Sequence, residues 1–184
     1  VHGINYIILF ILIVGLLNSF NLMDGLDGLV SGYSIIIATM CFLLSMGNNL
    51  TFVSYLSAAT IGSTLGFLKF NANPARIFLG DSGSLSLGYL VSALVIAISG
   101  EVSNPALITS TDHAGRIDLA FIIIALAVPI VDTLRVMLVR LKERKHIFLA
   151  DFSHLHHILY SKNIEHKTAV MIIHLFSIMF ALLA

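Results

Sequence analysis

Two aspartates with glycine neighbours, Asp24 and Asp27, follow the first apolar stretch of the chain in the sequence NSFNLMDGLDGL. If this segment continues as a helix, carboxylates three residues apart project from one side, and the glycines let a ligand approach the backbone closely. Such a pair can hold a cation or a substrate. The alternative is that both carboxylates are simply solvated at a membrane interface, since charged groups deeper in the bilayer are costly.

A third aspartate, Asp81, lies in FLGDSGSL among glycine and serine residues, directly before another apolar stretch. The free N–H groups at the start of a helix attract phosphate, and Mg²⁺ favours one or two carboxylates together with phosphate oxygens. The pattern therefore suggests a place for a metal-bound phosphate. An ordinary helix cap, in which Asp or Ser opens the helix, explains the same residues equally well.

Three histidines within four residues form the sequence HLHH: His154, His156 and His157. Clustered imidazoles either bind a transition metal or act as proton-dependent donors to an anionic substrate. Four basic residues between positions 140 and 145 favour an anion, because nearby positive charge opposes the approach of a metal ion. A basic loop that only sets membrane orientation would explain the Lys and Arg residues, but it would leave the histidines unexplained.

The three motifs together supply what phosphoryl transfer needs. They offer carboxylates for a divalent ion, glycine-lined backbone for phosphates, and basic residues with histidines for further phosphate contacts. In this chemistry, positioning and charge neutralisation supply most of the catalysis. At a membrane, the same set of residues implies one substrate that arrives from the lipid phase and one that arrives from the cytosol.

These motifs occur in a chain of 184 residues that is 58% hydrophobic and 11% charged, against about 25% charged in soluble domains. Apolar stretches long enough to cross a bilayer, about 20 residues each, recur at 4–22, 29–46, 50–69, 84–100, 117–138 and 167–184. We therefore predict an all-α polytopic integral membrane protein, with residues 1–184 as one transmembrane catalytic domain. The chain opens at Val1 and stops within an apolar stretch, so we expect a fragment truncated at both ends.

The basic residues fall almost entirely on one side of the six predicted spans. The loops after spans one, three and five, with the adjoining span ends, hold nine of the ten Lys and Arg residues, and the opposite side holds Arg116. Because positively charged loops stay in the cytoplasm, we expect all three motifs on the cytoplasmic face.

In their order and spacing, N-x-x-N-x-x-DGLDGL, FNxNPARIFLGDSGSLSLG and HLHH resemble the polyprenyl-phosphate N-acetylhexosamine-1-phosphate transferases of glycosyltransferase family 4, over nearly the whole chain. The resemblance implies transfer of a sugar 1-phosphate from a UDP-N-acetyl sugar to undecaprenyl or another polyprenyl phosphate, with release of UMP. It also implies a need for Mg²⁺, with Mn²⁺ as a substitute. The expected whole protein is a bacterial inner-membrane enzyme of about ten to eleven spans, a homodimer, with no nucleic-acid partner.

The resemblance also implies roles for individual residues. Asp81 looks like the Mg²⁺ ligand, and Asn21 and Asp24 look like members of the catalytic cluster. The residues similar to the family's uridine pocket are Gly25, Leu26, Asp27, Asn71 and Phe78. Phe78 would stack on uracil, and Asn71 or Asp27 would bond its edge. The residues that look like contacts to the sugar and diphosphate are His154, His156 and His157.

The HLHH form is similar to the branch that uses UDP-GlcNAc to start O-antigen, enterobacterial common antigen, teichoic acid or capsule synthesis. The alternative branch, the phospho-MurNAc-pentapeptide transferases of peptidoglycan synthesis, more typically carries three consecutive histidines. Two family features are missing, because the chain has no adjacent aspartate pair and carries Ala150, Asp151 and Phe152 where Pro-Asp-Arg is usual. We therefore expect this chain alone to lack a complete site.

Two readings from other classes remain open at this stage. An ion or metal transporter lined by aspartates and histidines would place polar residues in the middle of several spans, whereas the acids here lie at span ends on one side. A catalytically inactive relative with a scaffold role is the other alternative.

Overall fold

The computed structural model describes residues 2–102, 119–142, 158–159 and 164–184. Within these residues every regular element is a helix, which confirms the all-α prediction for this part of the chain. The helices are α1 (His2–Met23), α2 (Leu29–Gly47), α3 (Thr51–Asn71), α4 (Gly80–Val102), α5 (Leu119–Ala125), α6 (Ala127–Lys142) and α8 (His166–Leu183).

Several of the described helices have the dimensions of membrane spans. Four are long and apolar enough to cross a bilayer: Leu29–Gly47, Thr51–Asn71, Gly80–Ser99 and His166–Leu183. The stretch Leu9–Met23 within α1 is a shorter apolar helix. By length and composition, the chain is therefore a polytopic helical membrane protein, as the sequence predicts.

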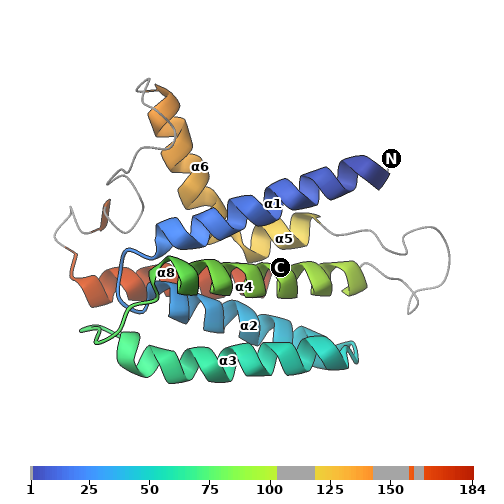
Figure 1. Cartoon of the computed structure of the whole chain (residues 1–184), viewed down its shortest axis with the longest axis horizontal. Coiled ribbons are helices and arrows are strands. Elements are labelled where there is room, and N and C mark those ends of the chain that lie inside the picture. Colours follow the sequence, from blue (N-terminus) through green and yellow to red (C-terminus); the bar gives the residue numbers. More distant parts are fainter. Residues whose placement is uncertain (1, 103–118, 143–157, 160–163) are drawn as a thin grey trace.

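The sequence predicts one continuous span over residues 117–138. The structure instead divides this stretch into α5 and α6 at Leu126. Pro129 follows the division and has no backbone N–H, so it cannot bond the carbonyl of Ala125 four residues earlier. The hydroxyl of Tyr33 on α2 donates to that carbonyl instead, across 3.4 Å. As a result α6 departs steeply from the direction of α5 and of the other helices (Figure 1).

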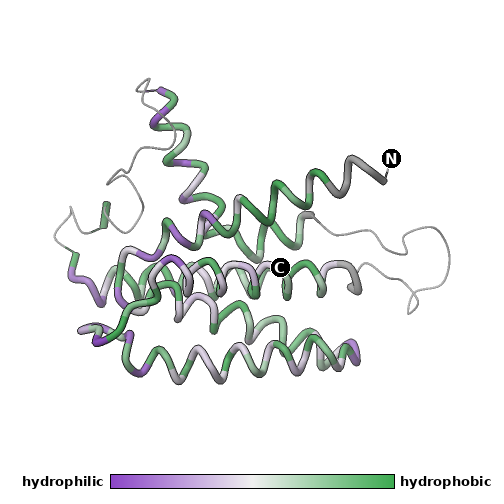
Figure 2. Tube along the Cα trace, in the orientation of Figure 1, coloured by the Kyte–Doolittle hydropathy of each residue, from purple (hydrophilic) through white to green (hydrophobic). Residues whose placement is uncertain are grey.

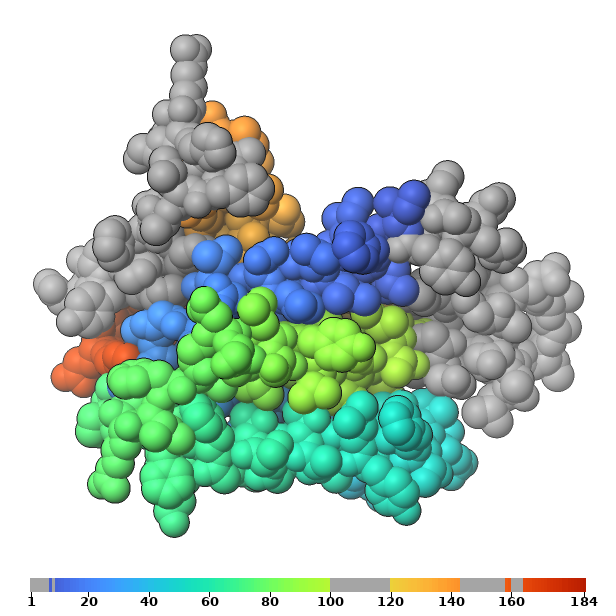
Figure 3. Space-filling model, viewed as in Figure 1, coloured from blue at the N-terminus to red at the C-terminus, as the bar shows by residue number. Residues whose placement is uncertain are grey.

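Successive helices from α1 to α4 run in opposite directions, so the α1–α2 and α3–α4 connections lie at the same end of the bundle (Figure 1). We call this end, which carries residues 24–28 and 72–79, the polar end. α8 also begins there (Figure 1). α2 is the central helix and packs against α3, α4 and α8. On one face of the molecule α4 lies between α1 and α3 (Figure 3).

The start of α2 lies in the core, since residues 29–34 are all buried. The ring of Tyr33 lies edge-on against Phe20 of α1, with ring centroids 5.4 Å apart. Small and hydroxyl residues line the contact between α2 and α3, and the Ser45 and Ser54 hydroxyl oxygens are 2.8 Å apart. The buried residues of α3 are Val53, Ser57, Thr60, Thr64 and Asn71. Such residues let helices approach closely where burial of apolar surface gives no advantage over lipid.

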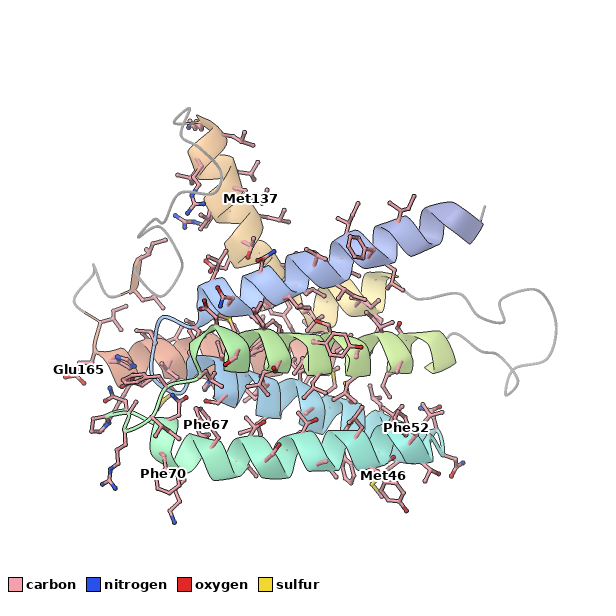
Figure 4. The ribbon with its side chains drawn as sticks, viewed as in Figure 1. Met46, Phe52, Phe67, Phe70, Met137 and Glu165 are labelled. Carbon is pink, nitrogen blue, oxygen red and sulfur yellow. The ribbon has the colours of Figure 1, made fainter. Side chains whose placement is uncertain are left out.

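Many large hydrophobic side chains are exposed on the helices. Hydrophilic residues gather at the polar end, along parts of α6 and at the α2–α3 connection (Figure 2). Met46 and Phe52 lie at the opposite end of the bundle, and Phe52 is 77% exposed (Figure 4). On α6, Asp132 and Arg140 are buried while Leu138 is exposed. Two of the charged side chains of α6 are therefore buried, whereas Arg135 and Lys142 of the same helix are exposed.

Candidate active site

The DGLDG motif (residues 24–28) and the segment 71–81 meet at the polar end of the bundle, where Phe70 and Glu165 also lie (Figure 4). The sequence-based prediction that these two loops share one end of the spans is therefore confirmed. His154, His156 and His157 lie outside the described residues. The site that the structure describes is thus formed by the ends of α1 and α3 and the starts of α2 and α4.

Asn71, the last residue of α3, fixes the two loops to each other. Its buried side-chain carbonyl accepts hydrogen bonds from the Gly28 N–H at 3.1 Å and the Ser31 hydroxyl at 2.7 Å. Its amide nitrogen donates to the Ile77 carbonyl at 3.0 Å. A buried amide with partners on both ends is costly to disturb, so Asn71 holds the DGLDG motif, α3 and the α3–α4 connection as one unit.

Asp27 contributes a second connection between the same loops. Its Oδ2 accepts from the Asn73 side-chain amide and from the Ala75 N–H, each at 3.0 Å. The next residue, Gly28, has a φ of 77°, in the left-handed region that favours glycine. A Cβ at this position would also come within 3.4 Å of a Leu68 methyl group. Gly28 therefore lets the chain turn into α2 while it stays close to α3.

Asn21, in the last turn of α1, connects this loop to the start of α4. Its amide nitrogen donates to Asp81 Oδ1 and to the Ser84 hydroxyl, each at 3.0 Å. The close approach of the two helices depends on Gly88, where a Cβ would come within 2.9 Å of the Phe20 Cβ. Asn21 and Asp81 belong to different motifs in the sequence, and the α1–α4 contact brings them together.

The carboxyl group of Asp24 lies where a negative charge is unfavourable. Partial burial, and secondarily the charge of Asp81, raise its pKa from 3.8 to about 6. Among the described residues, no hydrogen-bond donor reaches its carboxylate. Raised pKa values from burial and a like charge are frequent at functional sites. Within the part of the chain that the structure describes, neither cause is offset by a positive charge beside Asp24.

A divalent cation such as Mg²⁺ fits this pair. Mg²⁺ takes oxygen ligands and commonly uses only one or two carboxylates, with phosphates and water completing its shell. Asp81 is exposed and Asp24 is half-buried at the polar end, and the two carboxyl groups are close enough for the charge of Asp81 to raise the pKa of Asp24. Within the described residues no group of three or more His, Cys, Asp or Glu side chains could hold a metal by itself.

The residues predicted for a uridine pocket have different surroundings. Phe78 is 73% exposed, so its ring is open to stacking, and Gly25 is exposed as well. Leu26 is half-buried and packs against the core. Asn71 is buried and uses its amide within the protein.

Three supporting residues were absent from the sequence-based prediction of the site: Ser31, Asn73 and Ser84. Each is a hydrogen-bond partner of a predicted residue. Asn73 and Ser84 lie inside the motif FNANPARIFLGDSGSLSLG, so their polar side chains already marked them as candidates. Their hydrogen-bond partners depend on which helices are in contact, which the sequence does not specify.

Comparison with known proteins gives a consistent picture. The sequence model of a family described as glycosyl transferase family 4 matches residues 2–99. The chain is 36% identical over 172 residues to a probable undecaprenyl-phosphate N-acetylglucosaminyl 1-phosphate transferase of Bacillus subtilis, covering 94% of this chain and 45% of the relative. It is 32% identical to a decaprenyl-phosphate N-acetylglucosaminephosphotransferase of Mycobacterium leprae, covering 89% and 43% respectively.

A relative named for a different transfer reaction matches a shorter part of the chain. The phospho-N-acetylmuramoyl-pentapeptide-transferase of Clostridioides difficile is 47% identical over 111 residues, covering 54% of this chain and 34% of the relative. The chain therefore spans less than half the length of each of these three relatives.

Proposed function

Because this chain belongs to glycosyl transferase family 4, we propose that it is part of a membrane enzyme that transfers an N-acetylhexosamine 1-phosphate from a UDP-sugar to a polyprenyl phosphate. The observation that carries the proposal is the hydrogen bond from Asn21 to Asp81 at the start of α4, which joins the first two motifs close to Asp24, whose pKa responds to the charge of Asp81. Paired carboxylates next to the free N–H groups of a helix suit a metal-bound diphosphate.

The reaction is a phosphoryl transfer. An oxygen of the lipid phosphate attacks the sugar-bearing phosphorus of the UDP-sugar and forms a new P–O bond. The bond between that phosphorus and the bridging oxygen breaks, and its electron pair leaves with UMP. The products are a polyprenyl diphospho-sugar and UMP. When bound, Mg²⁺ would neutralise the diphosphate oxygens and so favour the departure of UMP.

The residues of this chain divide the work of holding the substrates. We assign Asp81 and Asp24 as carboxylates that hold the ion, and Asn21 as the residue that orients Asp81. We assign the exposed ring of Phe78 to stacking on uracil. Asp27 uses Oδ2 within the protein, so we assign its Oδ1 to the uracil edge. Asn71, whose amide is engaged at both ends, becomes a support for this pocket.

The location proposed for the site is the cytoplasmic face of a bacterial inner membrane. Lys69 and Arg76 lie at or beside the polar end, and Arg140 and Lys142 lie in the last turn of α6. Positively charged segments stay in the cytoplasm. UDP-sugars are soluble cytosolic compounds, so a site at this face meets its donor directly.

The favoured donor is UDP-GlcNAc. The relatives named for N-acetylglucosaminyl phosphate transfer match 94% and 89% of the chain, whereas the phospho-N-acetylmuramoyl-pentapeptide-transferase of Clostridioides difficile matches 54%. The higher identity of that shorter match nevertheless makes UDP-MurNAc-pentapeptide the second candidate. The pathway expected for the product is the synthesis of a cell-envelope polysaccharide.

The test is release of UMP by membranes that carry the full-length parent protein. UMP release should require UDP-GlcNAc, a polyprenyl phosphate and Mg²⁺ together, and omission of any one should abolish it. Asp81→Asn should reduce the rate by at least about 100-fold, while Ser82→Ala, at the exposed neighbouring position, should retain it. If Asp81→Asn left the rate untouched, the assignment of the metal ligand would be wrong. Faster release from UDP-MurNAc-pentapeptide would favour the second candidate.

A further inference from the structure

His174 of α8 occupies a notch in α2 that is made by a glycine. An added Cβ at Gly32 would lie 2.3 Å from the His174 Cε1 and 2.6 Å from its Nε2, which real atoms do not tolerate. The imidazole therefore lies where any other residue would place a side chain. The notch brings α8 and α2 together directly behind the DGLDG motif, since Gly32 is four residues after Gly28.

From this notch the imidazole reaches the first carbonyl of α2. His174 Nε2 lies 3.0 Å from the Leu29 carbonyl oxygen. A carbonyl oxygen can only accept a hydrogen bond, so Nε2 must carry the proton and donate. This hydrogen bond connects α8 to another helix. By contrast, the Ser177 hydroxyl of α8 donates to the carbonyl of Ile173 in its own helix.

The DGLDG motif is thereby held from two directions. On the α3 side, Asn71 accepts a hydrogen bond from the Gly28 N–H, and Asp27 accepts hydrogen bonds from the α3–α4 connection. On the α8 side, His174 holds the carbonyl of Leu29, the residue directly after the motif. Two anchors on adjacent residues restrict both the position and the rotation of the turn that carries Asp27.

We propose that His174 is a positioning residue for the nucleotide-sugar pocket, acting through the Leu29 carbonyl on the DGLDG motif. Its ring and the Gly32 notch fix α8 against α2, and its Nε2–H fixes the carboxyl end of the motif. The inference rests on the proposed function for its substrate, but the structural part can be tested without turnover. Loss of this hydrogen bond should weaken binding of the UDP-sugar more than it slows the chemical step.

The first experiment compares two substitutions in the full-length parent protein. His174→Gln keeps an N–H donor near the position of Nε2, and His174→Leu fills the space without a donor. Hydrogen exchange of the peptide that covers residues 26–33 should rise in His174→Leu and stay near wild type in His174→Gln. The KM for UDP-GlcNAc should rise about tenfold in His174→Leu, the equivalent of one lost hydrogen bond, with kcat within about threefold. Glutamine should restore the KM.

The second experiment uses the glycine. Gly32→Ala forces the imidazole out of its notch and should raise both the exchange of residues 26–33 and the KM. In a His174→Ala background the same change should add little, because the ring it displaces is gone. Gly62→Ala, where an added Cβ has open space in α3, is the matched control and should change neither quantity.

The outcomes separate this inference from the proposed function. Unchanged exchange in His174→Leu, or equal behaviour of the Gln and Leu variants, would overturn the positioning role. Additive effects of Gly32→Ala and His174→Ala would overturn it too. Absence of UMP release from the wild-type protein with UDP-GlcNAc would overturn the proposed function, yet the exchange measurements would still decide the role of His174.

Discussion

Asp24 and Asp27 lie three residues apart in one short motif, and the structure places them in opposite situations. The Asp27 carboxylate accepts two hydrogen bonds at 3.0 Å from the α3–α4 connection. The Asp24 carboxylate has no donor among the described residues, is half-buried, and shares its surroundings with Asp81, so its pKa is raised to about 6. Asp27 stabilises the loop, whereas the charge of Asp24 has no compensating partner among the described residues. The comparison teaches that hydrogen bonds and burial distinguish two aspartates whose spacing in the sequence does not.

The largest effect that would test this comparison is on activity. Asp24→Asn should reduce UMP release by the full-length parent by at least about 100-fold, because it removes a carboxylate from the proposed cation site. The same change should leave thermal stability equal or slightly higher, since it also removes a desolvated charge next to Asp81. Rate and unfolding temperature should be measured on the same purified protein. If Asp24→Asn lowered the unfolding temperature but retained activity, Asp24 would be a supporting residue and not part of the cation site.

Asn71→Leu should give the largest effect on stability. It removes a buried amide and leaves the Gly28 N–H, the Ser31 hydroxyl and the Ile77 carbonyl without their partner. Unpaired buried polar groups cost about 1–3 kcal/mol each, so we expect a loss of about 3 kcal/mol or more. Thermal unfolding in detergent measures it. Asn48→Leu is the control, since Asn48 is exposed and bonds only its own helix; an equal loss in both variants would contradict the supporting role.

For Asp27, two substitutions should behave differently. Asp27→Ala removes the acceptor for Asn73 and Ala75 and should lower the free energy of unfolding by about 1–3 kcal/mol. Asp27→Asn keeps an oxygen at the same place and should retain most of the stability. Denaturant or thermal unfolding of both variants decides the matter. If Asn were as damaging as Ala, the negative charge rather than the hydrogen bonds would be what the loop needs.

The smallest effect expected is a dependence on pH that belongs to Asp24. Because its pKa in the folded protein lies near 6, above the ordinary 3.8, its contribution to stability is full below about pH 4. That contribution is lost as the pH rises through 6. Mg²⁺ binds the ionised form, so its stabilising effect should be larger above pH 6 than below. The shift in unfolding temperature on adding Mg²⁺ at pH 5 and pH 7.5 measures this. In Asp24→Asn the pH dependence of the shift should shrink; an unchanged dependence would exclude Asp24 as its source.

Much of the fold was predictable from the sequence because its cause is local. Bilayer thickness fixes the length of an apolar stretch, so the predicted stretches 29–46, 50–69 and 84–100 agree closely with α2, α3 and α4. The alternation of spans likewise placed the DGLDG motif and the start of α4 at one end. The division of the fifth span had a visible signal in Pro129, but the prediction did not anticipate that Tyr33 would satisfy the carbonyl released at Ala125.

The sequence by itself determined which residue types gather at the polar end and that their chemistry suits phosphate and a divalent cation. Only the tertiary structure decided how those residues divide their roles. Asn21 meets Asp81, Asp27 meets Asn73, and His174 meets Leu29 because particular helices touch at particular glycines. Such contacts join residues far apart in the chain through helix packing, and neither composition nor periodicity specifies which faces will meet.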